Sequence, residues 1–144
     1  MLDKAALAAL IPHTGSMCLL DAVEEWTGER IRCTSLTHCD PSNPLRKHGA
    51  LAALHLIEYA AQAMAVHGAL LAGDGPQPGM LGVLRDIRLH AERIDDLRTP
   101  LIINATRRLA RADGLIYDFD VELNGPPNRL LSEGRISVVL RPAR

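Results

Sequence analysis

One stretch of the chain, from Ala50 to Ala72 (ALAALHLIEYAAQAMAVHGALLA), is apolar almost throughout and rich in alanine and leucine. Wrapped on an α-helix at about 100° per residue, it presents no continuous polar face. At about 1.5 Å per residue the helix would be roughly 33 Å long, enough to run through the middle of a small domain. The stretch therefore predicts a long helix that is buried on every side.

A membrane span is the main alternative for this stretch, because about 20 apolar residues can cross a bilayer. The run contains His55, Glu58, Gln62 and His67, and ionisable groups are costly in lipid. Nothing else in the chain is typical of a membrane protein. We therefore expect a helix that is surrounded by protein and no membrane span.

Length and composition favour one soluble domain. The chain has 144 residues with a hydrophobic fraction of 47%, which suits a single domain over residues 1–144. A net charge of -1 and an aromatic content of 3% argue against nucleic-acid binding, since neither a basic surface nor stacking platforms are available. The N-terminal run MLDKAALAALIPH lacks the hydrophobic strength of a signal peptide, so we expect a cytoplasmic protein.

The three cysteines indicate free thiols. Cys18, Cys33 and Cys39 are odd in number and lack the CxxC spacing of a zinc site. We expect them to be reduced in the cytoplasm, and we expect no bound metal and no organic cofactor. HExxH, a glycine-rich phosphate loop and GxSxG are all missing from the sequence.

The remaining segments predict a short first helix and about six strands. Asp3 is a good N-cap for a helix through about Leu10, which Pro12 would end. The expected strands are MCLLDAVEEW and ERIRCTSLTH before the long helix, then MLGVLRDIRLHA, PLIINATRRLAR, LIYDFDVEL and RLLSEGRISVVL after it. Two of these stretches are longer than an average strand of about 5–6 residues, so they should be bent or bulged.

The segment CDPSNPLRKHG should be a loop that connects the second strand to the long helix, which should begin near Gly49 or Ala50. The free amides at that helix start would form an electropositive pocket. An antiparallel sheet that curls round the helix would cover one side of it, which predicts an α+β fold. A second copy would cover the other side, so we expect a homodimer or a higher homo-oligomer.

Four polar residues of the helix, His55, Glu58, Tyr59 and Gln62, follow an i, i+3, i+4, i+7 pattern and should form one narrow stripe. A buried carboxylate needs a partner, because removing its charge from water costs several kcal/mol. Glu58 could be a structural group bonded to its neighbours. It could also be a general acid or base whose pKa is raised by apolar surroundings.

Two motifs carry a resemblance to a known family. IPHTGSMCLLDAV (residues 11–23) resembles the LPHRxPFLLVDRV opening of the beta-hydroxyacyl-acyl-carrier-protein dehydratases, and LIEYAAQA (residues 56–63) resembles their central-helix motif. LRKHGALAALHLIEYAAQAMA is closer still to LRxxGxLPAxxxIEYxAQAxA, a pattern of a divergent branch found with aryl-polyene clusters. The resemblance covers essentially the whole chain and implies the hot-dog fold, a long helix wrapped by a curled sheet.

The resemblance also implies a reaction, the elimination of water from a 3-hydroxyacyl group on an acyl carrier protein. In that family a histidine removes a proton from C2, the helix carboxyl protonates the departing hydroxyl, and amides at the helix start polarise the thioester carbonyl. Glu58 matches the acid. The histidine of the family's GHFPG loop is missing, because its position is occupied by Pro44.

The base is therefore open among several histidines. His13, in the opening motif, is the preferred candidate, with a turn histidine bonded to the backbone as the alternative. His48, in the loop before the helix, is the second candidate, although it could simply be a solvated loop residue. His55 lies one turn from Glu58 and is better explained as its partner on the helix.

Other polar residues have supporting or structural interpretations. Gly49, Gln62, Tyr59 and His55 are assigned to the substrate-binding surroundings, where Gln62 would orient Glu58 by a hydrogen bond and Tyr59 would line an interface or a tunnel. The remaining candidates are expected to be structural: His38 and His90 at strand ends, His67 in the core, and Asp21 at a strand edge.

The resulting hypothesis is a hydro-lyase, a 3-hydroxyacyl-carrier-protein dehydratase of fatty-acid or polyene biosynthesis with Glu58, His13 and His48 as its catalytic candidates. One alternative is a hot-dog thioesterase that uses Glu58 to activate water. Another is a non-catalytic subunit that supports a related, active hot-dog partner. Arginines after the long helix could form a basic rim for an acidic carrier protein: Arg85, Arg88, Arg93, Arg98, Arg107, Arg108 and Arg111.

Overall fold

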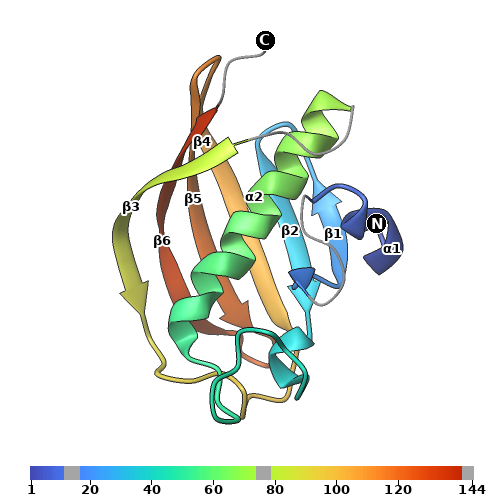
Figure 1. Cartoon of the computed structure of the whole chain (residues 1–144), viewed down its shortest axis with the longest axis vertical. Helices are drawn as coiled ribbons and strands as arrows, with labels where there is room; N and C mark the ends of the chain where they lie inside the picture. The colour runs from blue at the N-terminus through green and yellow to red at the C-terminus, as the bar shows by residue number, and fades with distance from the viewer. Residues whose placement is uncertain (12–16, 74–78, 141–144) are drawn as a thin grey trace.

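The computed structural model describes residues 1–11, 17–73 and 79–140 (Figure 1). A helix of 17 residues, α2 (Leu56–Ala72), lies across one face of a six-stranded antiparallel sheet. It ends at Gly73, whose left-handed backbone (φ 76°) is the common way for a helix to stop. The predicted arrangement, one long helix against a curled sheet, is confirmed.

The sheet has the strand order β1-β2-β4-β5-β6-β3. Its members are β1 (Ala22–Trp26), β2 (Arg30–Ser35), β3 (Gly79–Leu89), β4 (Leu101–Arg111), β5 (Gly114–Leu123) and β6 (Arg129–Leu140). The pairings of β3 with β6, of β4 with β5 and of β5 with β6 contain register shifts, so the long strands are bulged as predicted. β1 begins five residues later than predicted, because the main chain of residues 17–19 bonds to α2 instead of to the sheet.

The core lies between the sheet and α2. Alternate residues of the central strands are buried, among them Ile31 and Cys33 on β2 and Ile103 on β4, because successive side chains of a strand point to opposite faces. α2 contributes Leu56 and Ala60 to the same core, both without exposed surface. Alanine suits these positions since it lets the helix backbone approach the sheet closely.

The predicted first helix is present as α1 (Lys4–Ala8). The carboxylate of Asp3 caps it by accepting a hydrogen bond from the Ala6 amide at 3.0 Å, and Leu7 is fully buried. Within the described ranges, no helix combines the length and the apolar character that a membrane crossing needs.

The long helix begins later than predicted. A 3₁₀ turn, η3 (Ala53–His55), precedes α2, whereas the prediction placed the helix start near Gly49 or Ala50. His48 (φ 53°) and Gly49 (φ 77°) instead occupy a tight turn, in which the amides and carbonyls of Lys47 and Ala50 bond to each other. Two consecutive residues with positive φ cannot belong to a right-handed helix.

The segment between this turn and η3 is extended because it pairs with the chain that follows β3. The Ala53 amide donates to the Glu92 carbonyl at 2.9 Å, and the Ile94 amide donates to the Leu51 carbonyl at 2.9 Å. These backbone bonds replace the helical bonds that the apolar sequence alone favoured.

The prediction that the helix is buried on every side is wrong for the single chain. One stripe of α2 and η3, at helical spacing, is partly or fully exposed: Leu54, Glu58, Ala61, Ala65 and Gly68. Leu54 alone keeps 57% of its surface exposed. Apart from Glu58 the stripe is apolar, so hydropathy could not distinguish it from the buried sides of the helix.

Candidate active site

Glu58 lies in the first turn of α2, where a carboxylate is favoured by the positive end of the helix dipole. The residue is exposed, so the predicted burial of this carboxylate is wrong for the single chain. No hydrogen bond or ion pair joins its side chain to another residue of the described ranges. Glu58 is therefore a free acidic group in an apolar, half-exposed surface.

The histidine candidates do not pair with Glu58 within the described residues. His55 is half-buried at the junction of η3 and α2, and its side chain makes no capping bond. The expected hydrogen bond between His55 and Glu58 is absent among the described residues, and His55 is the last residue of the 3₁₀ turn. His48 is exposed at the tip of its turn, beside Gly49. His13, the preferred base, lies outside the described residues.

Tyr59 is fully buried in the single chain, which differs from the exposed position expected of an interface or tunnel-wall residue. Its hydroxyl forms a hydrogen bond with Thr37 Oγ1 at 2.8 Å and accepts one from Asn43 Nδ2 at 3.1 Å. Burial raises the pKa of the Tyr59 phenol. Tyr59 thus fastens the start of α2 to the loop that follows β2.

Gln62 does not orient Glu58, in contrast to the prediction. Its Oε1 accepts from the Leu19 amide at 2.9 Å, and its Nε2 donates to the Met17 carbonyl at 2.6 Å. Both ends of the amide are used to hold the segment before β1 against α2. The expected single stripe of polar residues is therefore split, since Tyr59 and Gln62 face loops of the same chain while Glu58 faces outward.

His67 belongs to the core, as predicted. Its Nε2–H donates to the Thr27 carbonyl at 2.8 Å, which leaves Nδ1 to accept from the Tyr117 hydroxyl at 2.5 Å. Burial lowers the pKa of the imidazole, and the positive charge of Arg107 acts in the same direction.

The other structural predictions can be compared directly with the hydrogen bonds. Asp21 accepts from the Leu36 amide at 2.7 Å and pairs with Lys4 at 3.1 Å, which confirms its strand-edge role. His90 directly follows β3 and bonds to Glu133 at 3.0 Å. His38 follows β2 closely, in the 3₁₀ turn η2 (Thr37–Cys39), and is fully buried.

One structurally important carboxylate, Asp95, was not found from the sequence. Its Oδ1 accepts from the Leu51 amide at 2.9 Å, and both of its oxygens bond to Arg93, which holds the pKa of the carboxyl well below its usual range. Asp95 therefore fixes the extended segment that leads to η3 and Glu58. The sequence around it, RIDDLRTP, indicates only a turn, because its partner Leu51 is far away along the chain.

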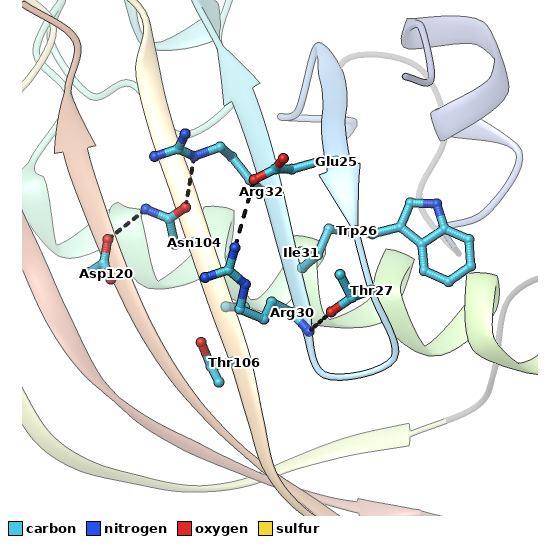
Figure 2. A pocket seen from close by; sticks show the side chains of 10 residues that line it. Glu25, Trp26, Thr27, Arg30, Ile31, Arg32, Asn104, Thr106 and Asp120 are labelled. Carbon is cyan, nitrogen blue, oxygen red and sulfur yellow. Dashed lines mark hydrogen bonds and ion pairs between the residues drawn. The ribbon is translucent and has the colours of Figure 1, made fainter.

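A separate recess of about 350 Å³ lies on the opposite face of the sheet (Figure 2). Arg32 Nε donates to Asn104 at 3.1 Å, Asn104 donates to Asp120 at 2.8 Å, and Arg30 and Trp26 also line the recess. The lining residues do not include Glu58. Within the described ranges, no group of three or more histidine, cysteine, aspartate or glutamate side chains is arranged to hold a metal ion.

Comparison with known families decides the relationship. The ApeP-like family, described as ApeP dehydratase, matches residues 5–143. The chain belongs to this family. The ApeP-like assignment agrees with the resemblance to the aryl-polyene branch that the two sequence motifs indicated. Comparison with curated proteins gives no match.

Solved structures similar to this ApeP-like chain share its hot-dog fold. The dehydratase heterocomplex ApeI:P from Xenorhabdus doucetiae matches with a TM-score of 0.79 and 20% identity, over 94% of this chain and 90% of that one. AziG from S. sahachiroi matches at 0.63 and 12%, over 88% and 94%. A thioesterase family protein from Silicibacter pomeroyi matches at 0.63 and 8%, over 85% of both chains.

Within the described residues of this ApeP-like chain, Glu58 therefore has no hydrogen-bonded partner. Glu58 is held at a defined place by Tyr59, Gln62 and the Asp95 contacts, but it lies on an exposed face. Among the described residues of one chain, no imidazole is bonded to it.

Proposed function

We propose that this protein acts in the dehydration of 3-hydroxyacyl thioesters carried by an acyl carrier protein, with Glu58 protonating the departing hydroxyl. The observation that carries the proposal is the ApeP dehydratase family match together with the exposed Glu58 at the start of α2. Hydroxide is a poor leaving group, so a positioned carboxyl that donates a proton would lower the barrier.

A second hot-dog subunit would complete this site. The stripe of Leu54, Ala61, Ala65 and Gly68 beside Glu58 is apolar and partly exposed. Covering it would exclude water from the carboxyl and strengthen its interactions with a bound substrate. The partner is another copy of this chain or a related dehydratase subunit, and the similarity to the ApeI:P heterocomplex supports the second form.

His13 remains the preferred base and His48 the second candidate. His48 is exposed and its turn lies just before the segment that leads to Glu58, so its imidazole is accessible to a substrate or a partner. A base from the partner subunit would serve equally in the proposed reaction, because the C2 proton and the hydroxyl leave from different atoms of the substrate.

The proposal is tested by incubating the protein, alone and with a co-expressed related hot-dog subunit, with a 3-hydroxyacyl carrier-protein substrate. We expect the trans-2-enoyl product, detected by mass spectrometry of the carrier protein. Glu58→Gln should lower its rate by about 100-fold or more. The matched control is Glu24→Gln, an exposed glutamate on β1, which should leave the rate unchanged. Equal rates for Glu58→Gln and wild type would contradict the role of Glu58.

A non-catalytic subunit is the second candidate function. It is favoured by Pro44 in place of the expected histidine and by the lack of any partner for Glu58 among the described residues. In that case the isolated protein would be folded and inactive, and the partner's activity would survive Glu58→Gln. Release of free acid and free carrier thiol, instead of an enoyl product, would indicate a thioesterase.

A further inference from the structure

The face of the sheet opposite α2, the outer face, carries polar side chains in two rows that cross the strands. The strand register sets each row in the order β2, β4, β5: Arg32, Asn104 and Asp120 in the first row, and Arg30, Thr106 and Asp118 in the second. Neighbouring strands are about 4.8 Å apart. β4 therefore has basic residues on one flank and acidic residues at a similar distance on the other.

The two charges of the first row are separated by a neutral amide. Asn104 Oδ1 accepts from Arg32 Nε at 3.1 Å, and Asn104 Nδ2 donates to Asp120 at 2.8 Å (Figure 2). Among the described residues, neither Arg32 nor Asp120 belongs to an ion pair. Burial raises the pKa of the Asp120 carboxyl, against the effect of the bond from Asn104. Both charges can therefore take a partner of opposite charge.

The recess of about 350 Å³ lies over these rows, with Arg30, Arg32 and Asp120 in its lining. The ion pair between Arg30 and Glu25 is 3.8 Å long, and 65% and 63% of their side chains are exposed. Such a pair contributes little to stability, so Arg30 can exchange it for another partner. The recess gives the side chains of an incoming surface room between the two flanks of β4.

We propose that the outer face binds the outer face of a second copy of this chain, about a two-fold axis that runs along β4. This rotation places β2 of each copy over β5 of the other, so Arg32 of one copy faces Asp120 of the other. Stacked sheets are about 10 Å apart, a gap that arginine and aspartate side chains span together. Asn104 and Thr106 lie on the axis, where each residue meets its own copy and a charge would meet a like charge.

The other charges of the outer face limit where the two copies attract each other. Asp118 already accepts from Arg135 at 2.7 Å and from Arg108 at 2.9 Å, and the second bond draws Arg108 from β4 towards β5. At the rim, Glu25 of one copy would face Glu133 of the other. Their side chains are 63% and 38% exposed, so water and salt screen this repulsion. The attraction is therefore concentrated in the first row.

The experiment measures the mass of the full-length protein in solution by light scattering at low salt, with the charge-reversed variants Arg32→Glu and Asp120→Lys. Each variant alone brings like charges together at both symmetric contacts, so we expect half the wild-type mass. An equimolar mixture should regain the wild-type mass, because both contacts between unlike variants join opposite charges. Mixing cannot repair a defect within one chain. The matched control is Asp113→Lys, in the exposed turn between β4 and β5, which should keep the wild-type mass.

Neutral variants keep the test decisive if charge reversal destabilises the chain. Arg32→Gln and Asp120→Asn should each weaken the association roughly tenfold or more, as measured by sedimentation over a concentration series. High salt should weaken it in wild type as well. Glu58 lies on the other side of the sheet, so failure of this proposal would leave the proposed reaction intact. A wild-type mass equal to that of both charge-reversed variants, or a mixture that keeps the mass of its components, would overturn the proposal.

Discussion

The polar side chains of α2 fall into two groups with opposite surroundings. Tyr59, Gln62 and His67 are buried, and each has hydrogen-bond partners at both ends of its polar group or ring. Glu58, in the same helix, is exposed and has no such partner within the described residues. The fold of one chain explains why Tyr59, Gln62 and His67 are polar, because it supplies their hydrogen-bond partners. It does not explain why residue 58 is a glutamate.

This difference indicates how structural and functional polar groups can be separated. A buried polar group without hydrogen-bond partners destabilises the folded chain. The stability of the fold is therefore a sufficient reason for such a group to have partners. A carboxylate without a partner in an apolar surface does not stabilise the folded single chain. The stability of the fold should therefore depend on Tyr59, Gln62 and His67, and activity should depend on Glu58.

The largest effect on stability is expected at Gln62. Gln62→Leu keeps a similar volume but leaves the Leu19 amide and the Met17 carbonyl without partners. We expect the free energy of unfolding to fall by about 2–4 kcal/mol, at about 1–3 kcal/mol per buried unpaired group. Urea unfolding followed by circular dichroism measures this change. A loss below about 0.5 kcal/mol would show that Gln62 is not a structural clamp.

A smaller loss is expected for Tyr59→Phe, which removes only the hydroxyl. Thr37 and Asn43 lose one partner each, and both keep other hydrogen bonds. The unfolding free energy should fall by about 1–2 kcal/mol. The same urea titration measures this loss. Tyr117→Phe is the matched variant, because it removes the tyrosine hydroxyl that bonds to His67. An unchanged midpoint for Tyr59→Phe would contradict its fastening role.

The buried histidine makes stability depend on pH. The pKa of His67 is lowered in the folded state, so below pH 6.5 the unfolded chain binds a proton that the folded chain does not. Stability is present at neutral pH and is lost as the pH falls from about 6.5 towards the folded pKa. Between pH 7.5 and 5.5 protonation of His67 in the unfolded chain should therefore lower the free energy of unfolding.

This pH effect is separated from other groups by comparing wild type with His67→Gln. The pKa of His38 is also lowered, so it contributes to the wild-type loss in the same direction. In the variant the loss of unfolding free energy between pH 7.5 and 5.5 should be smaller than in wild type, as measured by urea unfolding at both pH values. An identical loss in both proteins would show that a group other than His67 causes the pH dependence.

The smallest effect on stability is expected at Glu58 itself. Glu58→Gln should change the unfolding free energy of the isolated chain by no more than about 0.5 kcal/mol, as for most exposed positions. Thermal and urea unfolding are the measurements. A loss comparable to that of Gln62→Leu would remove the contrast between the two groups and return Glu58 to a structural role.

Much of the fold could be predicted from the sequence because its signals are local. Alternating apolar residues placed β4, β5 and β6 within one or two residues, and Asp3 marked the start of α1; the predicted end of β2 was three residues too late. The apolar stretch ended at Ala72, which is the last residue of α2. The two motifs around residues 11–23 and 56–63 also indicated the family to which the chain belongs.

The candidate site was predicted less well because it depends on contacts between side chains and segments that are distant in the sequence. Burial of a helix face is decided by the segments that pass over it, and the sequence of α2 is apolar on its exposed stripe too. The partners of Gln62 lie more than 40 residues away, and Asp95 reaches back 44 residues to Leu51.

What the sequence determined by itself was therefore the set of elements, their order and the identity of Glu58 as the acidic residue of the helix. The tertiary structure decided that Glu58 faces outward, that Tyr59 and Gln62 face inward, and that α2 begins at Leu56, after the 3₁₀ turn η3. The physical reason is that hydropathy and periodicity act between neighbours along the chain. Hydrogen bonds between distant segments, such as Leu19 to Gln62, decide which side of the helix is covered.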